Sequence, residues 1–470
     1  MKIVKKFLSF SIGTWLGAVV GLITIPLMTR LFSPEELGRA TMFTLALNVL
    51  MLFTMFGVDQ AFIRFFYEEE TKKLLRKCLT LTFCVFLVNL VLIFIFRKPL
   101  SVYLFGFYDP WIMLLLGMAS IIYALNNYSL AVLRMSQMGW QYSIAQLALR
   151  LLELVFIILF FYLLGNGYST LVLAKVLTIF LVTVIAVMLR LRYGKPQQLV
   201  AAREDHSMIE ILKYSYPLAL TAVLNWMLQS TDKIAIKQWS TYKELGVYVA
   251  AYRIVAILDV IVTSFSVYWT PLALERFLKR SYDENKVFYQ KANAMISFGM
   301  IMAVVGLIMS KDLIVLMLGK NYRDAATIMP FLVFYPLMYI TSETTVIGIN
   351  FFKKVRWHLL ISFAVLAVNI SSNLLLVPRL GARGAAISIG MSYVLFFVLR
   401  THISLRYYKV GYYLKRFYAL VALIICYAFY SAFFTWGIFN LFSGLLVIGV
   451  TVIAYYKDLK YGLNMYYQKA

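Results

Sequence analysis

Charged side chains are scarce in this sequence, since Asp, Glu, Lys and Arg make up only 14% of its 470 residues. Soluble domains carry about 25% charged and about 45 to 50% apolar residues. In this chain 62% of the residues are hydrophobic. The composition therefore excludes an ordinary soluble enzyme or binding domain, and it indicates a protein that crosses a membrane several times.

Cysteine and histidine are also rare, with three residues of each type. Cys78, Cys84 and Cys426 lack the spacing of a redox or metal-binding motif, and the histidines are scattered along the chain. We interpret the cysteines as packing residues. The sequence therefore predicts neither a metal centre nor another cofactor.

Long apolar stretches recur along the whole chain, separated by short polar breaks. A helix needs about 20 predominantly apolar residues to cross a bilayer. We therefore predict an all-α polytopic membrane protein with about fourteen transmembrane helices. The predicted spans are 7–29, 40–63, 78–96, 111–133, 142–163, 169–189, 214–237, 247–271, 292–309, 328–351, 358–377, 385–400, 417–435 and 440–456.

Basic residues are distributed unevenly among the breaks between these spans. With the N-terminus placed in the cytoplasm, 30 of the 45 Lys and Arg residues fall in cytoplasmic segments and 11 in external ones. Because positively charged loops remain in the cytoplasm, we predict that both termini lie there. The net charge of +24 then reflects proximity to anionic lipid headgroups, and it predicts no nucleic-acid partner.

Two internal alignments divide the sequence into similar halves. Residues 36–38 and 244–246 both read Glu-Leu-Gly, and residues 164–165 and 380–381 both read Leu-Gly. Each half holds six spans, so the halves share one orientation, and we predict two bundles around a central cavity, related by a pseudo-two-fold axis along the membrane normal. The predicted parts are a six-helix bundle at 1–190, a cytoplasmic linker at 191–213, a six-helix bundle at 214–405, and helices 13 and 14 with the tail at 406–470.

Three segments carry a resemblance to a known family. Residues 29–40 (TRLFSPEELGRA), 214–254 (including NWMLQSTDKIAIKQW) and 373–390 (NLLLVPRLGARGAAISIG) resemble Wzx-like polysaccharide flippases. These belong to the multidrug/oligosaccharidyl-lipid/polysaccharide exporter superfamily, and the similarity runs over nearly the whole chain.

The resemblance implies movement of an undecaprenyl-pyrophosphate-linked oligosaccharide from the cytoplasmic to the outer leaflet of the bacterial plasma (inner) membrane. Such movement serves surface polysaccharide biosynthesis, as in O-antigen or capsule export. Besides membrane lipids, the implied partners are glycosyltransferases and a polysaccharide polymerase.

Other functions share parts of this pattern. A peptidoglycan-precursor flippase and a multidrug exporter of the same superfamily have the same architecture, although the exporter usually has twelve spans. A membrane-bound polysaccharide polymerase or ligase would instead need catalytic groups in sizeable external loops. No predicted external loop exceeds about 18 residues, so we predict transport rather than an enzymatic reaction.

Ionisable residues inside the predicted spans are the candidate site residues, because charges are costly in hydrocarbon and mark pathways, relays or binding sites. The alternative is that these charges pair with one another and fasten helices, as Arg150 could with Glu153 or Asp232 with Arg253. The candidates for binding the substrate pyrophosphate are Lys175, Arg253, Lys233 and Arg150. The candidates for coupling transport to protons or sodium are Asp259, Glu343 and Asp232.

Overall fold

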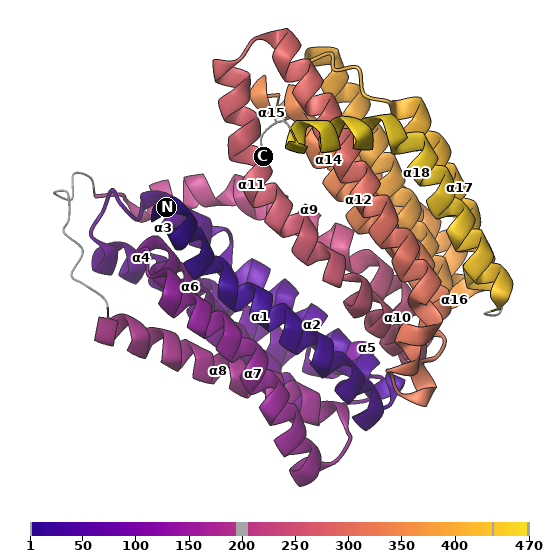
Figure 1. The fold of residues 1–470 in the computed structure, drawn as a ribbon. Helices are drawn as coiled ribbons and strands as arrows, with labels where there is room; N and C mark the ends of the chain where they lie inside the picture. Colours follow the sequence, from indigo (N-terminus) through magenta and orange to yellow (C-terminus); the bar gives the residue numbers. More distant parts are fainter. Residues whose placement is uncertain (1, 194–204, 355, 435–436, 468–470) are drawn as a thin grey trace. The chain divides into compact units, whose positions relative to one another are not determined.

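All regular structure in the described residues is helical (Figure 1). The computed structural model describes residues 2–193, 205–354, 356–434 and 437–467. Of the helices in these ranges, 11 are long and apolar enough to cross a membrane. The predicted all-α membrane class is therefore confirmed. Residues 194–204 of the predicted linker lie outside the described residues.

The chain forms two compact units, residues 1–230 and 231–470. In the first unit α1 packs on α7, α7 on α8, α8 on α6, and α6 on α2 (Figure 1). Its helices are α1 (Lys2–Leu31), α2 (Pro34–Met55), α3 (Val58–Phe65), α4 (Thr71–Ile95), α5 (Arg97–Phe105), α6 (Pro110–Met135), α7 (Gly139–Leu164) and α8 (Tyr168–Tyr193). The boundary between the units falls within α9 (Met208–Trp239).

The second unit is built around α14 and α16, which pack on each other and on their neighbours α12 and α13. Two further helices, α17 and α18, pack together, and α18 also covers α12 (Figure 1). The helices of this unit after α9 are α10 (Tyr242–Val255), α11 (Ile257–Lys279), α12 (Tyr282–Leu316), α13 (Ala325–Leu332), α14 (Phe334–Thr345), α15 (Ile347–Phe351), α16 (Arg356–Tyr407), α17 (Leu414–Phe433) and α18 (Ile438–Tyr467), with a 3-10 turn at Lys320–Tyr322.

Several predicted spans are interrupted helices. The predicted span 40–63 comprises α2 and α3, which are separated where Phe56 and Gly57 have φ values of 44° and 74°. A Cβ on Gly57 would lie 2.5 Å from the carbonyl oxygen of Ser215 in α9. Glycine is therefore needed both for the left-handed backbone and for the close approach of α9.

Proline explains a second interruption, in the predicted span 328–351. This segment forms α13, α14 and α15 instead of one continuous helix. Pro336 has no backbone N–H, and its ring disfavours a helical hydrogen bond to residue 332, where α13 ends. The predicted spans 358–377 and 385–400 are two helices within α16, joined at a kink where Gly381 has non-helical backbone angles.

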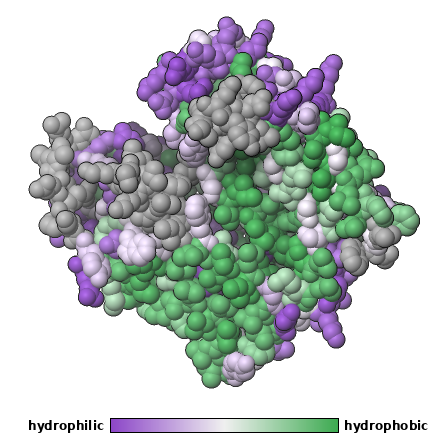
Figure 2. Space-filling model, in the orientation of Figure 1, coloured by the Kyte–Doolittle hydropathy of each residue, from purple (hydrophilic) through white to green (hydrophobic). Residues whose placement is uncertain are grey.

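Hydrophobic side chains cover much of the visible surface, and hydrophilic ones gather near helix ends (Figure 2). On α4, for example, Val88, Val91, Phe94 and Ile95 are each more than half exposed. Contiguous apolar surface of this kind is rare on soluble monomers. It is suited to hydrocarbon, in agreement with the membrane-spanning class.

The two aligned halves of the sequence make equivalent contacts, each inside its own unit. Glu36 Oε2 accepts a hydrogen bond of 2.5 Å from the backbone N–H of Tyr168, where α8 begins. Glu244 Oε2 accepts one of 2.6 Å from the backbone N–H of Ala382, directly after Gly381 in α16. These contacts support the alignment of residues 36–38 with 244–246.

Candidate functional site

Asp232 and Lys233 lie on α9 within the second unit and face α10. The Asp232 side chain is fully buried, and its Oδ2 accepts a hydrogen bond from the hydroxyl of the buried Tyr248. Lys233 Nζ lies 3.8 Å from Asp232 Oδ1 and 4.9 Å from the centre of the Tyr252 ring. Two candidates from the sequence are thus joined in one polar group with two tyrosines. Arg253, the next residue of α10, lies within electrostatic range of the buried Tyr322.

Glu343 of α14 forms a buried ion pair with Arg400 of α16. The distance from Arg400 Nη1 to Glu343 Oε1 is 2.8 Å, and the two side chains are only 8% and 11% exposed. Arg400 Nη1 also donates a hydrogen bond of 2.7 Å to Ser342 Oγ. A buried charge needs such partners to offset the loss of water.

Arg400 ends the predicted span 385–400 but was not among the candidate site residues, and the structure buries its side chain inside the second unit. Ser392, Thr401 and Ser404 are buried on the same helix. These small polar residues among apolar neighbours are the sequence signal that could have marked Arg400 as a buried candidate.

Lys175 and Arg150, the candidates of the first unit, lie on α8 and α7. Lys175 of α8 is half-buried, and its Nζ donates a hydrogen bond of 3.3 Å to Thr44 Oγ1 of α2. Arg150 of α7 is 60% exposed at its side chain and lies 4.0 Å from Glu153 Oε2. The structure therefore places Lys175 between helices and Arg150 at a surface, near the carboxylate of Glu153.

Asp259 lies in the first turn of α11 in the second unit. Its Oδ1 atom is buried and has no hydrogen-bond partner among the described residues. Tyr252 and Tyr335 both lie within electrostatic range of this carboxylate. A buried acceptor without a donor is costly, so Asp259 is a candidate for binding a proton, an ion or a hydroxyl group.

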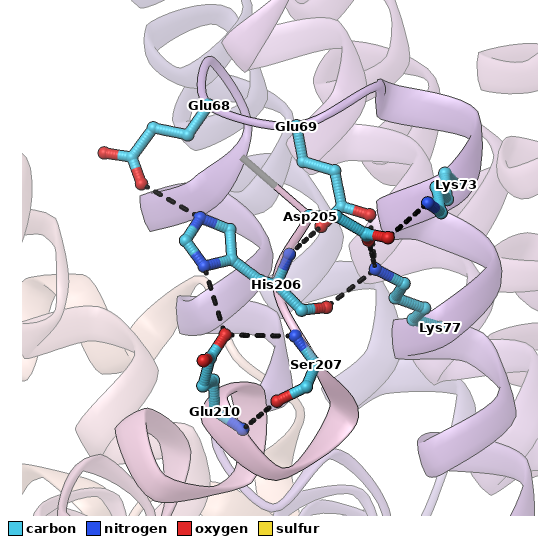
Figure 3. Close-up of polar contacts among 8 residues, drawn as sticks. All are labelled: Glu68, Glu69, Lys73, Lys77, Asp205, His206, Ser207 and Glu210. Carbon is cyan, nitrogen blue, oxygen red and sulfur yellow. Dashed lines mark hydrogen bonds and ion pairs between the residues drawn. The ribbon is translucent and has the colours of Figure 1, made fainter. Parts of the chain in front are cut away.

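A second polar group, which the sequence did not single out, lies in the first unit where α3 ends and α4 and α9 begin (Figure 3). Lys77 Nζ donates hydrogen bonds of 2.6 Å to Glu69 Oε1 and 2.7 Å to the carbonyl oxygen of His206, and a further one to Asp205. We call this group the α4–α9 cluster. Its members are Glu68, Glu69, Lys73, Lys77, Asp205, His206, Ser207 and Glu210.

The His206 ring sits between two carboxylates of the α4–α9 cluster. Its Nε2 lies 3.3 Å from Glu68 Oε2 and its Nδ1 lies 3.5 Å from Glu210 Oε2 (Figure 3). The ring also stacks on Phe65, with 4.1 Å between ring centres. These contacts attach the N-terminus of α9 to the first unit.

The carboxyl group of Asp205 has a lowered pKa in this cluster. Hydrogen bonds from the ammonium groups of Lys73 and Lys77 lower the pKa of Asp205 to about 2. The Asp205 carboxylate therefore remains charged over the whole physiological range. The sequence did not single out Lys73 and Lys77, because Asp205, the partner that they share, lies more than 120 residues away.

Comparison with known proteins places this chain in a family. A family model described as "polysaccharide biosynthesis protein" matches residues 27–327. No curated protein matches the chain.

Solved structures of transporters share its fold. The lipid II flippase MurJ in an inward closed conformation has a TM-score of 0.69 at 16% identity, covering 96% of this chain and 99% of MurJ. An inward-facing multidrug resistance MATE family transporter of the MOP superfamily has a TM-score of 0.65 at 17% identity, covering 89% of this chain and 99% of the transporter. The resemblance read from the sequence is thereby confirmed: the chain belongs to the polysaccharide biosynthesis protein family and has the fold of MOP-superfamily flippases and transporters.

Proposed function

We propose that this protein moves an undecaprenyl-pyrophosphate-linked oligosaccharide repeat unit from the cytoplasmic to the outer leaflet of the bacterial plasma membrane. The movement would supply a surface polysaccharide such as O antigen or capsule. The observation that carries the proposal is the family match, because it covers most of the first unit and continues well into the second. The transporter fold agrees with it.

The cations inside the spans suit a lipid-linked pyrophosphate. Charge-assisted hydrogen bonds from Lys or Arg to phosphate are short and strong, and low surrounding dielectric strengthens them. Lys233, Arg253 and Lys175 all lie on helices within predicted spans and are only partly exposed. Together with Arg150 they are the proposed pyrophosphate ligands, Lys175 and Arg150 from the first unit and Lys233 and Arg253 from the second.

The proposed mechanism is alternating access. The sugar and the pyrophosphate would pass through the polar interior while the prenyl tail stays in lipid, and no covalent bond would change. Asp259, with its buried unpartnered oxygen, is the first candidate for coupling to a proton or sodium gradient. Asp232 and Glu343 are further candidates, although each already has a cationic partner.

A peptidoglycan-precursor flippase is the second candidate function. The fold is shared with both the lipid II flippase MurJ and a multidrug MATE transporter, so a multidrug exporter is a further alternative. Both flippase functions move a saccharide that is attached to a lipid through a pyrophosphate. They differ in the identity of that saccharide.

Deletion of the gene in the organism that encodes it tests the proposed function. Loss of a surface polysaccharide, with accumulation of its lipid-linked repeat unit on the cytoplasmic side, is the expected result. Loss of cell-wall synthesis with an intact surface polysaccharide would favour the peptidoglycan-precursor flippase instead. Unchanged levels of both polymers would contradict a flippase function.

A further inference from the structure

Five aromatic rings form a continuous surface inside the second unit. We call it the aromatic stripe, and it consists of Tyr252 of α10, Tyr335 and Tyr339 of α14, and Tyr393 and Phe396 of α16. The ring centres of neighbours lie close together, at 6.5 Å for Tyr252–Tyr335, 4.6 Å for Tyr335–Tyr393, 5.7 Å for Tyr393–Phe396 and 6.0 Å for Tyr339–Phe396. Three helices therefore contribute to one surface.

Cations lie at both ends of the aromatic stripe. Lys233 Nζ is 4.9 Å from the centre of the Tyr252 ring. At the other end the guanidinium carbon of Arg400 is 5.2 Å from the Phe396 ring and 5.9 Å from the Tyr339 ring. Each cation is paired with a carboxylate, Lys233 with Asp232 and Arg400 with Glu343, so a ligand lying along the stripe would meet an ion pair at either end.

The exposure pattern of α14 indicates that the stripe borders a polar space. Every residue of this helix is buried except Tyr335, Tyr339 and Glu343, which are partly exposed. Their spacing of four residues places them on one face of the helix. Because ionisable side chains inside membrane spans face a bundle interior or a water-filled cavity, a face that ends in Glu343 is unsuited to lipid.

Asp259 adds a hydrogen-bond acceptor beside the stripe. Its buried Oδ1 has no partner among the described residues, and the carboxylate lies within electrostatic range of Tyr252 and Tyr335. A buried polar atom of this kind calls for a donor that the described protein does not supply. The hydroxyl groups of a sugar are suitable donors.

We propose that the aromatic stripe binds the saccharide portion of the substrate, with a pyranose ring stacked on Tyr335 and its neighbours and a sugar hydroxyl bound to Asp259. Aromatic rings carry negative charge on their faces, so the polarised C–H bonds on one face of a pyranose pack well against them. This inference rests on the proposed flippase function and adds the site at which the sugar is recognised.

The test compares two probes that bind to the purified full-length protein in lipid nanodiscs. The probes are polyprenyl pyrophosphate and the same lipid carrying an N-acetylhexosamine. We expect the wild-type protein to bind the sugar-bearing probe about tenfold more tightly, as one stacked ring with a hydrogen bond would give. Free N-acetylhexosamine, added as a competitor, separates recognition of a lipid-linked sugar from that of any sugar.

Variants that replace an aromatic ring by an apolar aliphatic side chain test whether the aromatic stripe produces the preference for the sugar-bearing probe. Tyr335→Leu and Phe396→Leu should reduce it to about twofold or less, whereas Tyr335→Phe should retain it because the ring remains. Tyr268→Leu is the matched control, since this tyrosine of α11 is 67% exposed and lies outside the stripe. Asp259→Asn keeps the shape and tests the carboxylate separately. Thermal unfolding of each variant shows whether it has folded.

Three outcomes would overturn the proposal. They are a wild-type protein without a preference for the sugar-bearing probe, Leu variants that fold and keep the preference, and a control that loses it. Failure of the flippase function itself gives a different result: the wild-type protein would then move neither probe across a liposome membrane, whatever its binding preference.

Discussion

The Glu244 carboxylate accepts a hydrogen bond of 2.6 Å from the backbone N–H of Ala382 in the second unit. Within the first unit, the Glu36 carboxylate accepts a similar bond from the backbone N–H of Tyr168. Each glutamate is three residues after the residue whose hydroxyl caps its own helix, Ser33 or Thr241. In a capping box the glutamate would bond back to its own helix. Here it instead satisfies a backbone donor of another segment, and a carboxylate at a helix N-terminus is favourable.

Replacing Glu244 by Ala should destabilise the second unit. The lost bond involves a charged acceptor, so we expect a cost of about 1 to 3 kcal/mol. Thermal unfolding of the purified variant in detergent measures it. Glu36→Ala should have a similar effect, and an unchanged midpoint for both variants would show that neither contact contributes to stability.

Gly381→Ala should be more damaging than the loss of Glu244. Gly381 has a φ of 54°, and a Cβ at this position would lie 1.8 Å from Glu244 Oε2. The side chain would clash with the carboxylate and strain the backbone. Gly299→Ala in α12 is the control because nothing lies within 4 Å of its Cβ position. We expect reduced protein accumulation only for the first variant, and equal accumulation of the two would contradict the role of Gly381.

Arg400→Leu should destabilise the protein by leaving Glu343 buried without its cation. Breaking a buried ion pair costs about 3 to 5 kcal/mol, whereas replacing both partners by apolar residues is often neutral. The double variant Arg400→Leu/Glu343→Leu should therefore unfold at a higher temperature than the single one. If the double variant is no more stable, the pair seen in the structure does not account for the burial of Arg400.

The α4–α9 cluster should hold the start of α9 over a wide pH range. The pKa of Asp205 is lowered to about 2. Its contribution is thus fully present above the ordinary Asp pKa and is lost only as the pH falls through the lowered value. Hydrogen exchange at residues 207–211 should be equally protected at about pH 7 and about pH 5.

Lys77→Met should remove most of that protection, because Lys77 bonds to Glu69, Asp205 and the carbonyl of His206. Lys72→Met, in the first turn of α4 and outside the cluster, is the matched control. Protection that survives in the Lys77 variant would show that other contacts attach α9 to the first unit.

The membrane-spanning class and the helical regions followed from hydropathy, since an apolar stretch of sufficient length has few alternatives to a helix in a bilayer. The breaks within the predicted spans 40–63 and 328–351 were not predicted from hydropathy. Gly57 and Pro336 sit inside apolar runs that read as continuous helices, and the close approach of Ser215 of α9 to Gly57 depends on packing between helices.

The charged candidates were recognisable from sequence, and so was the pair of Arg150 with Glu153 on one helix, but partners on other helices were not. Glu343 pairs with a residue 57 positions away, on another helix. The aromatic stripe likewise draws on three helices, and its tyrosines are indistinguishable in sequence from those expected at membrane interfaces. Contacts between distant segments depend on packing, which periodicity along one helix does not specify.

The central claim is tested most directly by measuring transbilayer movement of a labelled undecaprenyl-pyrophosphate-linked oligosaccharide in liposomes that contain the purified protein. The account predicts movement faster than in protein-free liposomes, and a marked loss of movement for Lys233→Ala that still folds. An absence of movement by the wild-type protein under both an imposed proton gradient and an imposed sodium gradient would contradict it.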